Sequence, residues 1–189
     1  MNSRYLAGVA AAVLIAGVLV TATFASAFPS WAVATAATAT EQNDSVTKLT
    51  VTGSDDIERK VDLAGDAVAG FGWADLVTLD VLVATIHPDF RDSAQNPDSW
   101  HLHAARLGGV DADSFCVQEF YPNPQGGISI QGDTLSVNLV NSDMPFETSE
   151  IDGAVGFVIN PVAASALCPA VFSGFGLQVD ITGAPVGLS

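Results

Sequence analysis

A chain of 189 residues suits a single domain, with or without an appendage. Its 6 Lys and Arg against 21 Asp and Glu give a formal net charge of −15, and every acidic residue lies at or after Glu41. Because nucleic acids and anionic lipids are bound through basic side chains, this charge excludes nucleic acid as a partner and leaves only the N-terminal segment for membrane contact. Two readings of the acidity remain, solubility in a salty medium and weak affinity for cations.

The N-terminal segment has the order of a secretory signal. Arg4 precedes an apolar run over residues 5–22, and the small residues 25–27 (ASA) match the site that signal peptidases accept. We predict a signal peptide over 1–27, or alternatively an uncleaved membrane-anchor helix, since the run is near the lower limit for spanning a bilayer. Either reading places the remaining chain outside the cell or on its surface. Residues 28–45 are rich in Ala and Thr without a consistent period and predict a flexible stalk.

Short β-type runs separated by turn residues fill the remaining chain, from residue 46 to residue 189. We predict an all-β domain, a single antiparallel β-sandwich or barrel of about eight strands, preceded by the N-terminal signal or anchor helix. Residues 65–72 hold three glycines and predict a loop, and residues 161–169 predict a short helix or an irregular crossover. The strands are predicted at 47–52, 57–63, 73–87, 100–107, 114–121, 127–131, 134–140, 153–159 and 175–181.

Two of these strand predictions rest on distinct signals. The dipeptide Gly132-Asp133 separates two alternating segments, which is the pattern of a tight two-residue hairpin. Residues 73–87 are predicted as one long strand, because its odd positions from Val77 to Val83 form an apolar face. Gly108-Gly109 predicts a turn between the strands that flank it.

The two cysteines, Cys116 and Cys168, predict a disulfide. An even number of cysteines in an exported chain favours a structural bond over catalytic thiols. In the chain-entropy model a loop of this length stabilises the fold by about 4 kcal/mol.

Three histidines, His87, His101 and His103, are the only ones in the chain and fall close together in sequence. His101 and His103 are two residues apart on a predicted strand, so their side chains point to the same face. If residues 88–100 connect two antiparallel strands, His87 falls opposite His101 and the three imidazoles converge. Three imidazoles with an open fourth position suit one zinc or copper ion.

Carboxylates in the intervening loop, Asp89, Asp92 and Asp98, are candidates for a further ligand or for a group that orients a ring. A second interpretation needs no metal. If Leu102 faces the core, His101 and His103 lie outside on a flat surface, and a one-residue register decides between the two.

The H-x-H strand followed by a cysteine, over residues 100–116, resembles copper/zinc superoxide dismutases and the related CHRD modules. The resemblance implies a β-sandwich in which His101 and His103 match the copper-binding pair. The dismutase pattern has six histidines across two metals, whereas this chain has three and no counterpart of the zinc-loop histidines.

No catalytic residue is assigned by the sequence. Ser173 lacks the G-x-S-x-G turn of hydrolases, and the acidic turns 55–58 and 111–113 lack the spacing of a known calcium loop. The sequence therefore predicts an exported domain that binds copper or zinc through three histidines. The alternative is a non-catalytic extracellular or cell-surface interaction domain whose histidines are incidental.

Overall fold

The computed structural model describes residues 28–60, 68–87 and 99–189. The predicted signal or anchor (1–27) and the loop carboxylates Asp89, Asp92 and Asp98 lie outside the described residues. Within them the chain forms eleven strands and three single-turn 3-10 helices, which confirms the all-β prediction. None of the described helices has the length and apolar character needed to cross a membrane.

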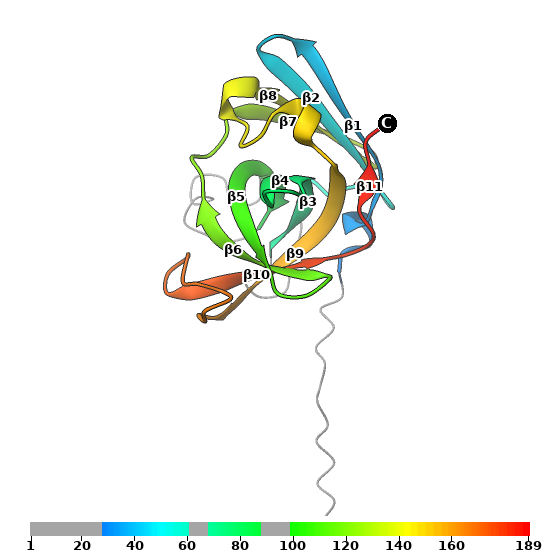
Figure 1. Ribbon diagram of the computed structural model, residues 1–189. Helices are drawn as coiled ribbons and strands as arrows, with labels where there is room; N and C mark the ends of the chain where they lie inside the picture. The colour runs from blue at the N-terminus through cyan, green and yellow to red at the C-terminus, as the bar shows by residue number, and fades with distance from the viewer. Residues whose placement is uncertain (1–27, 61–67, 88–98) are drawn as a thin grey trace, which may run out of the picture.

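The strands form two sheets that lie one above the other (Figure 1). The smaller sheet has the order β1-β2-β8-β7, and the larger has the order β10-β6-β5-β4-β3-β9-β11. The strands are β1 (Ala34–Asn43), β2 (Val46–Gly53), β3 (Val68–Asp75), β4 (Asp80–Ile86), β5 (His101–Gly109), β6 (Ser114–Phe120), β7 (Gly126–Gln131), β8 (Thr134–Val140), β9 (Gly153–Ala163), β10 (Phe175–Ile181) and β11 (Val186–Gly187).

The larger sheet closes on itself, because β10 pairs with β6 on one side and with β9 on the other. The result is a closed barrel of six antiparallel strands, with β11 added at the start of β9. The β9–β10 ladder has seven residue pairs, whereas the β6–β10 ladder has three. The seam between β6 and β10 is therefore the less extensively paired side of the closure.

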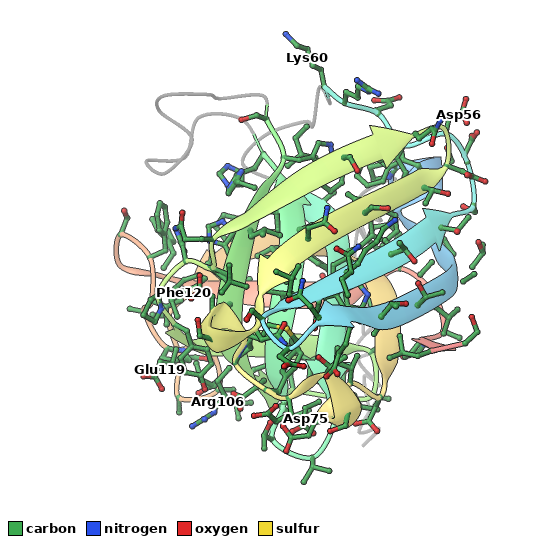
Figure 2. All side chains as sticks on the ribbon, turned by 90° about the horizontal axis from the view of Figure 1, so that it is seen from above. Asp56, Lys60, Asp75, Arg106, Glu119 and Phe120 are labelled. Carbon is green, nitrogen blue, oxygen red and sulfur yellow. A yellow bond between two sulfur atoms is a disulfide. The ribbon has the colours of Figure 1, made fainter. Side chains whose placement is uncertain are left out.

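The smaller sheet covers one side of the barrel, and its strands cross over the barrel strands (Figure 2). On β2, buried and half-buried residues alternate, so that Leu49 and Val51 face the barrel. The hairpin predicted around Gly132-Asp133 is confirmed, since β7 and β8 pair from Gln131↔Thr134 onward and Gly132 has a φ of 60°. Such a positive φ favours glycine and suits the first position of a tight hairpin turn.

Strands at the centre of the barrel sheet are buried on both faces. On β3, Phe71 and Trp73 pack in the core between the two sheets, while its alternate residues face the barrel interior. A second apolar cluster, which includes Val117, Phe157 and Val179, fills part of that interior. The fold thus has two cores, one between the sheets and one inside the barrel.

The prediction of one continuous strand over 73–87 is wrong. The segment is the β3–β4 hairpin, which turns over residues 76–79. The side chain of Asp75 accepts hydrogen bonds from the backbone N–H of Val77 and the hydroxyl of Thr78, and Leu79 has a φ of 60°. These local hydrogen bonds form a turn where the apolar pattern alone indicates a strand.

The prediction of a flexible stalk over 28–45 is wrong, because most of this segment is folded. The 3-10 helix η1 (Ser30–Ala32) and strand β1 occupy it, and Trp31 is buried with 2% exposure. Gly156 permits this, because a Cβ at that position would collide with the backbone carbonyl of Ala32. The N-terminal segment is held against the barrel by this close approach, which is a long-range contact.

Four smaller predictions also need correction. Residues 57–60 are not a strand, although 57–63 was predicted as one, and residues 68–72 belong to β3 rather than to the predicted loop. Gly108-Gly109 lies within β5, and the turn to β6 follows it. The glycines in both strands favour a turn locally, but pairing with neighbouring strands keeps them in the sheet. The irregular crossover over 161–169 is correct only from residue 164, since β9 extends to Ala163.

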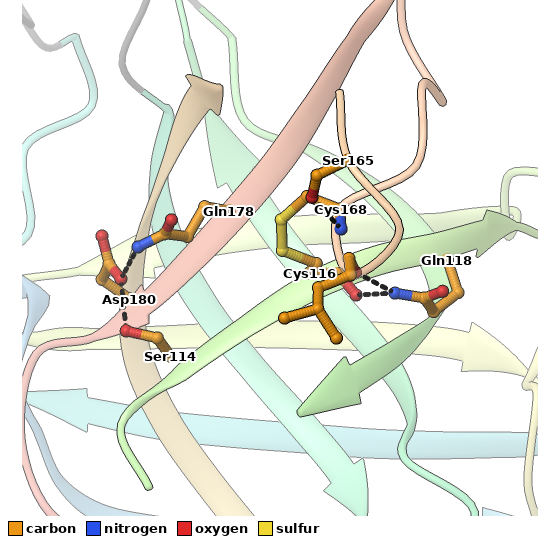
Figure 3. Close-up of a disulfide and its surroundings, with 8 residues drawn as sticks. Ser114, Cys116, Gln118, Ser165, Cys168, Gln178 and Asp180 are labelled. Atoms are coloured by element: carbon orange, nitrogen blue, oxygen red, sulfur yellow. Dashed lines mark hydrogen bonds between the residues drawn. A yellow bond between two sulfur atoms is a disulfide. The ribbon is translucent and has the colours of Figure 1, made fainter. Parts of the chain in front are cut away.

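The predicted disulfide is present, and it joins Cys116 on β6 to Cys168 in the loop between β9 and β10 (Figure 3). Both cysteines are buried. The side chain of Gln118 donates a hydrogen bond to the carbonyl of Leu167, which adds a second link between strand and loop. The bond therefore lies beside the short β6–β10 seam of the barrel.

The other short helices, η2 (Asn141–Asp143) and η3 (Thr148–Glu150), lie between β8 and β9. A capping box joins Glu147 and Glu150 across η3. The hydroxyl of Thr148 is hydrogen-bonded to that of Thr47, a fully buried residue on β2. This connection therefore ties the smaller sheet to the segment that leads into β9.

Candidate metal centre

The pairing of β4 with β5 brings the three histidines to one end of the barrel. Thr85 pairs with His101 and Val83 pairs with His103, so these four side chains share one face. His87 follows β4 directly and continues the face of Val83 and Thr85. The expectation that His87 lies directly opposite His101 is wrong, because Thr85, two residues before His87, occupies that position. The expectation that the three side chains share one face is correct.

The closure of the barrel decides between the two interpretations of which way His101 and His103 face. Leu102 does face the core between the sheets, with 6% exposure. The opposite face of β5 is nevertheless not a flat outer surface, because it lines the barrel interior. His87 is accordingly buried with 4% exposure, and His101 and His103 are half-buried.

The imidazole rings form a compact triangle. Ring centroids lie 4.6 Å apart for His87 and His101, 4.8 Å for His101 and His103, and 6.3 Å for His87 and His103. One nitrogen from each ring lies within 4.8 Å of the other two. A tetrahedral ion with bonds of 2.0–2.1 Å separates its ligand nitrogens by about 3.3 Å, so small side-chain rotations suffice to complete the site. Among the described residues, these histidines are the only group of three or more potential ligands close enough to hold one ion.

Hydrogen bonds orient two of the rings. Nδ1 of His101 lies 2.9 Å from the carbonyl oxygen of Ser99, and Nδ1 of His103 lies 3.3 Å from Oδ1 of Asn123. The backbone carbonyl of Ser99 can only accept, so Nδ1 of His101 carries a proton and donates this hydrogen bond. Donation of one ring N–H to a carbonyl while the other nitrogen binds the ion is the usual arrangement of a metal-bound histidine. Asn123 is a positioning residue that the sequence did not reveal.

An aromatic cluster fixes the start of β5. Trp100, immediately before His101, packs edge-on against Trp31 at 5.4 Å and stacks with Phe71 at 6.4 Å. Its indole N–H donates a hydrogen bond to the carbonyl of Glu58. These contacts hold the backbone that carries His101, and all three come from segments distant in the sequence.

A cavity of about 360 Å³ occupies the barrel interior and includes His87 and His103 in its wall. Of the 24 residues that line it, four are polar: Thr85, His87, His103 and Asp113. Three of these four lie at the histidine end of β4 and β5. The histidines thus border a space that is otherwise apolar.

The other end of the β4–β5 ladder carries a charged network. Asp80 is buried and accepts hydrogen bonds from Nε of Arg106 at 3.0 Å and from the hydroxyl of Tyr121 at 2.6 Å. Burial acts to raise the pKa of Asp80, but hydrogen bonds from Tyr121, Arg106 and Thr78 outweigh it and hold the pKa below its ordinary value. Burial and the hydrogen bond to Asp80 raise the pKa of Tyr121. The buried carboxylate of Asp80 has partners on β5 and in the segment after β6, which indicates a structural role.

The acidic turns do not form a comparable site. Asp55, Asp56 and Glu58 are exposed, as are Asp111 and Asp113. Asp55 accepts hydrogen bonds from Ser30 and from the backbone of Asp56, as an ordinary turn residue does. These exposed carboxylates therefore contribute negative charge to the surface and are solvated.

The chain was compared with protein-family models, with curated proteins and with solved structures, and none of them matches it.

Proposed function

We propose that this chain is an exported β-barrel protein that binds one divalent transition-metal ion, copper or zinc, through His87, His101 and His103. The observation that carries the proposal is the convergence of three imidazole nitrogens within 4.8 Å at the end of the barrel. Neutral imidazole suits Zn²⁺ and Cu²⁺ better than the hard cations Ca²⁺ and Mg²⁺, which prefer oxygen.

Two further features support this assignment. The hydrogen bond from Nδ1 of His101 to the carbonyl of Ser99 leaves the lone pair of that ring on Nε2, as metal binding requires, and Asn123 contacts the ring of His103. Three protein ligands leave a tetrahedral ion with a fourth position for water or an organic ligand. Water held there becomes more acidic, and a copper ion would add the capacity for one-electron chemistry.

Export is part of the same proposal. The disulfide between Cys116 and Cys168 supports an oxidising compartment, and the order of charged, apolar and small residues over 1–27 supports a secretory signal. Expression of the full chain followed by mass spectrometry of the secreted protein tests this. We expect a mature N-terminus directly after Ala27, and a protein retained in the cytoplasm with reduced cysteines would contradict export.

Metal content tests the central assignment. Chelated protein is dialysed against Zn²⁺ or Cu²⁺ in the presence of excess Mg²⁺, which occupies the weak carboxylate sites of a chain with a net charge of −15. We expect about one equivalent of retained ion in the wild type, as one tetrahedral site predicts.

Variants separate the histidine site from the acidic surface. His103→Ala should lose the ion, whereas the double variant Asp56→Asn/Glu58→Gln, which removes two exposed carboxylates, should retain it. No retained metal in the wild type, or equal retention by His103→Ala, would leave the non-catalytic extracellular interaction domain as the better account.

A further inference from the structure

We infer that the barrel interior binds a small, largely apolar organic molecule with one oxygen-bearing end, an alcohol, a carbonyl compound or a carboxylic acid. Its oxygen lies against Thr85 and the histidine cluster. The part of this inference that concerns the metal-facing end rests on the proposed metal site, whereas occupation of the cavity does not.

The size of the cavity is the first argument. Protein interiors pack as densely as organic crystals, and empty spaces larger than a water molecule are few. The space of about 360 Å³ falls within the range of roughly 300–1,000 Å³ that is usual for pockets that hold small organic molecules. Small inward-facing residues, Ala74 on β3 and Ala105 on β5, leave this space open.

The shape of the cavity is the second argument. Val81, Val83, Thr85 and His87 line it in succession along β4. At about 3.3 Å per residue, the distance from the first to the last is roughly 20 Å. The cavity is therefore elongated along the strands and suits a chain or a row of rings rather than a compact polar metabolite.

The third argument is the hydroxyl of Thr85. Thr85 is buried with 1% exposure and lines the cavity, and its Oγ1 has no hydrogen-bond partner among the described residues. A buried hydroxyl without a partner is costly, and most are satisfied in native proteins. An oxygen of a bound ligand would accept this hydrogen bond. Because Thr85 pairs with His101, the same oxygen would lie beside the histidine cluster.

The distribution of polarity gives the ligand its orientation. Thr85, His87 and His103 lie at one end of the cavity, and the remaining polar lining residue, Asp113, is exposed near the other end. Between them the wall is apolar. A molecule with one polar terminus would satisfy the histidine end and place its apolar body along the interior strands.

The test begins with chelated, solvent-extracted protein and the neutral fluorophore N-phenyl-1-naphthylamine, so that the metal plays no part. We expect saturable binding of one probe per chain and displacement by 1-decanol or decanoic acid in preference to decane. Ala105→Leu, whose larger side chain projects into the cavity, should weaken probe binding by about tenfold or more, because it occupies the space that the probe needs. Val140→Ser, an exposed position on β8, should leave binding unchanged.

Stability measurements show whether Ala105→Leu remains folded, so that a loss of probe binding can be attributed to the filled cavity. Ala105→Leu should unfold at a denaturant concentration no lower than the wild type, because the new side chain enters empty space. Ala84→Leu, a variant on the adjacent strand β4 whose side chain faces the packed core between the sheets, should be destabilised. Should Ala105→Leu fail to fold, Ala74→Leu fills the cavity from β3 and replaces it. Absence of probe binding, or full binding by the filled variant, would overturn the inference.

The polar end is tested separately. Thr85→Val should abolish the preference for decanol over decane, a preference of about two- to tenfold for one hydrogen bond, while probe binding stays intact. Loading wild type with Zn²⁺ should strengthen decanoic acid binding and leave decane unaffected. An unchanged affinity in protein that retains zinc would overturn the proposed orientation. Failure to retain zinc would instead refute the proposed function, and the chelated experiments would still decide whether the cavity is occupied.

Discussion

Removal of the disulfide should weaken the barrel at one identified seam. Cys116 and Cys168 are separated by 52 residues, and closing a loop of that length removes about 4 kcal/mol of conformational freedom from the unfolded chain at 25 °C. The double variant Cys116→Ala/Cys168→Ala should therefore lose about 4 kcal/mol in its free energy of unfolding. Equilibrium unfolding in urea, with wild type as the reference, measures this difference.

The location of the bond predicts where the loss is concentrated. The β6–β10 ladder has three residue pairs, and the disulfide lies beside it, whereas the β1–β2 hairpin is in the other sheet. Amide hydrogen exchange should accelerate first in peptides that cover Ser114–Phe120 and Phe175–Ile181. A loss of stability below about 1 kcal/mol, or an equal acceleration in β1 and β2, would refute this reasoning.

Three further substitutions test other features. Asp80→Asn should lower the free energy of unfolding by about 2 kcal/mol at pH 7, because it removes charged hydrogen bonds. Since the pKa of Asp80 is lowered in the folded state, the difference between wild type and variant should shrink as the pH falls below about 4. An equal difference in urea unfolding at pH 7 and at pH 3 would contradict this. Thr85→Val should raise the stability of chelated, ligand-free protein by about 1 kcal/mol in thermal unfolding, since it removes a buried hydroxyl that has no partner within residues 28–60, 68–87 and 99–189. A loss of that size would show that the hydroxyl has a partner. Gly176→Ala should destabilise the protein by about 1–3 kcal/mol, because its Cβ would lie 2.6 Å from the carbonyl oxygen of Cys168. Gly127→Ala, which has open space around the new Cβ, should leave stability unchanged, and equal unfolding midpoints for the two variants would refute the packing argument.

Local patterns in the sequence predicted the elements that depend on local physics. The β7–β8 hairpin follows from Gly132-Asp133 between alternating segments, and β10 matches its predicted range of 175–181. The shared face of His101 and His103 follows from the period of a strand. The disulfide follows from the number of cysteines in a chain with an export signal.

Elements stabilised by distant contacts were not predictable in this way. Strand β1 is an Ala- and Thr-rich segment whose anchor, Trp31, packs against Phe71 and Trp100. The turn between β3 and β4 places Val77 in solvent with 90% exposure. Because Val77 is apolar, the alternating pattern continues through the turn and predicts one uninterrupted strand. The real signal for the turn is Asp75, whose side chain binds the backbone of the turn.

The same distinction applies to the site. The sequence indicated which histidines share a face, but not that this face is the inside of a barrel. That depends on the closure of β10 onto β6, between strands about 60 residues apart in the chain. The cavity arises from the same closure and likewise has no local signal, whereas the contact of His103 with Asn123 follows from the pairing of β5 with β6.

X-ray absorption spectroscopy of the metal-loaded protein tests the central claim most directly, because it counts the atoms bound to the ion. With zinc, we expect a first shell of about four light atoms, three of them with the multiple-scattering signature of imidazole, at 2.0–2.1 Å. Since the chain has only three histidines, that signature accounts for all of them. A shell of oxygen atoms alone, without imidazole scattering, would contradict the account and assign the ion to the acidic surface.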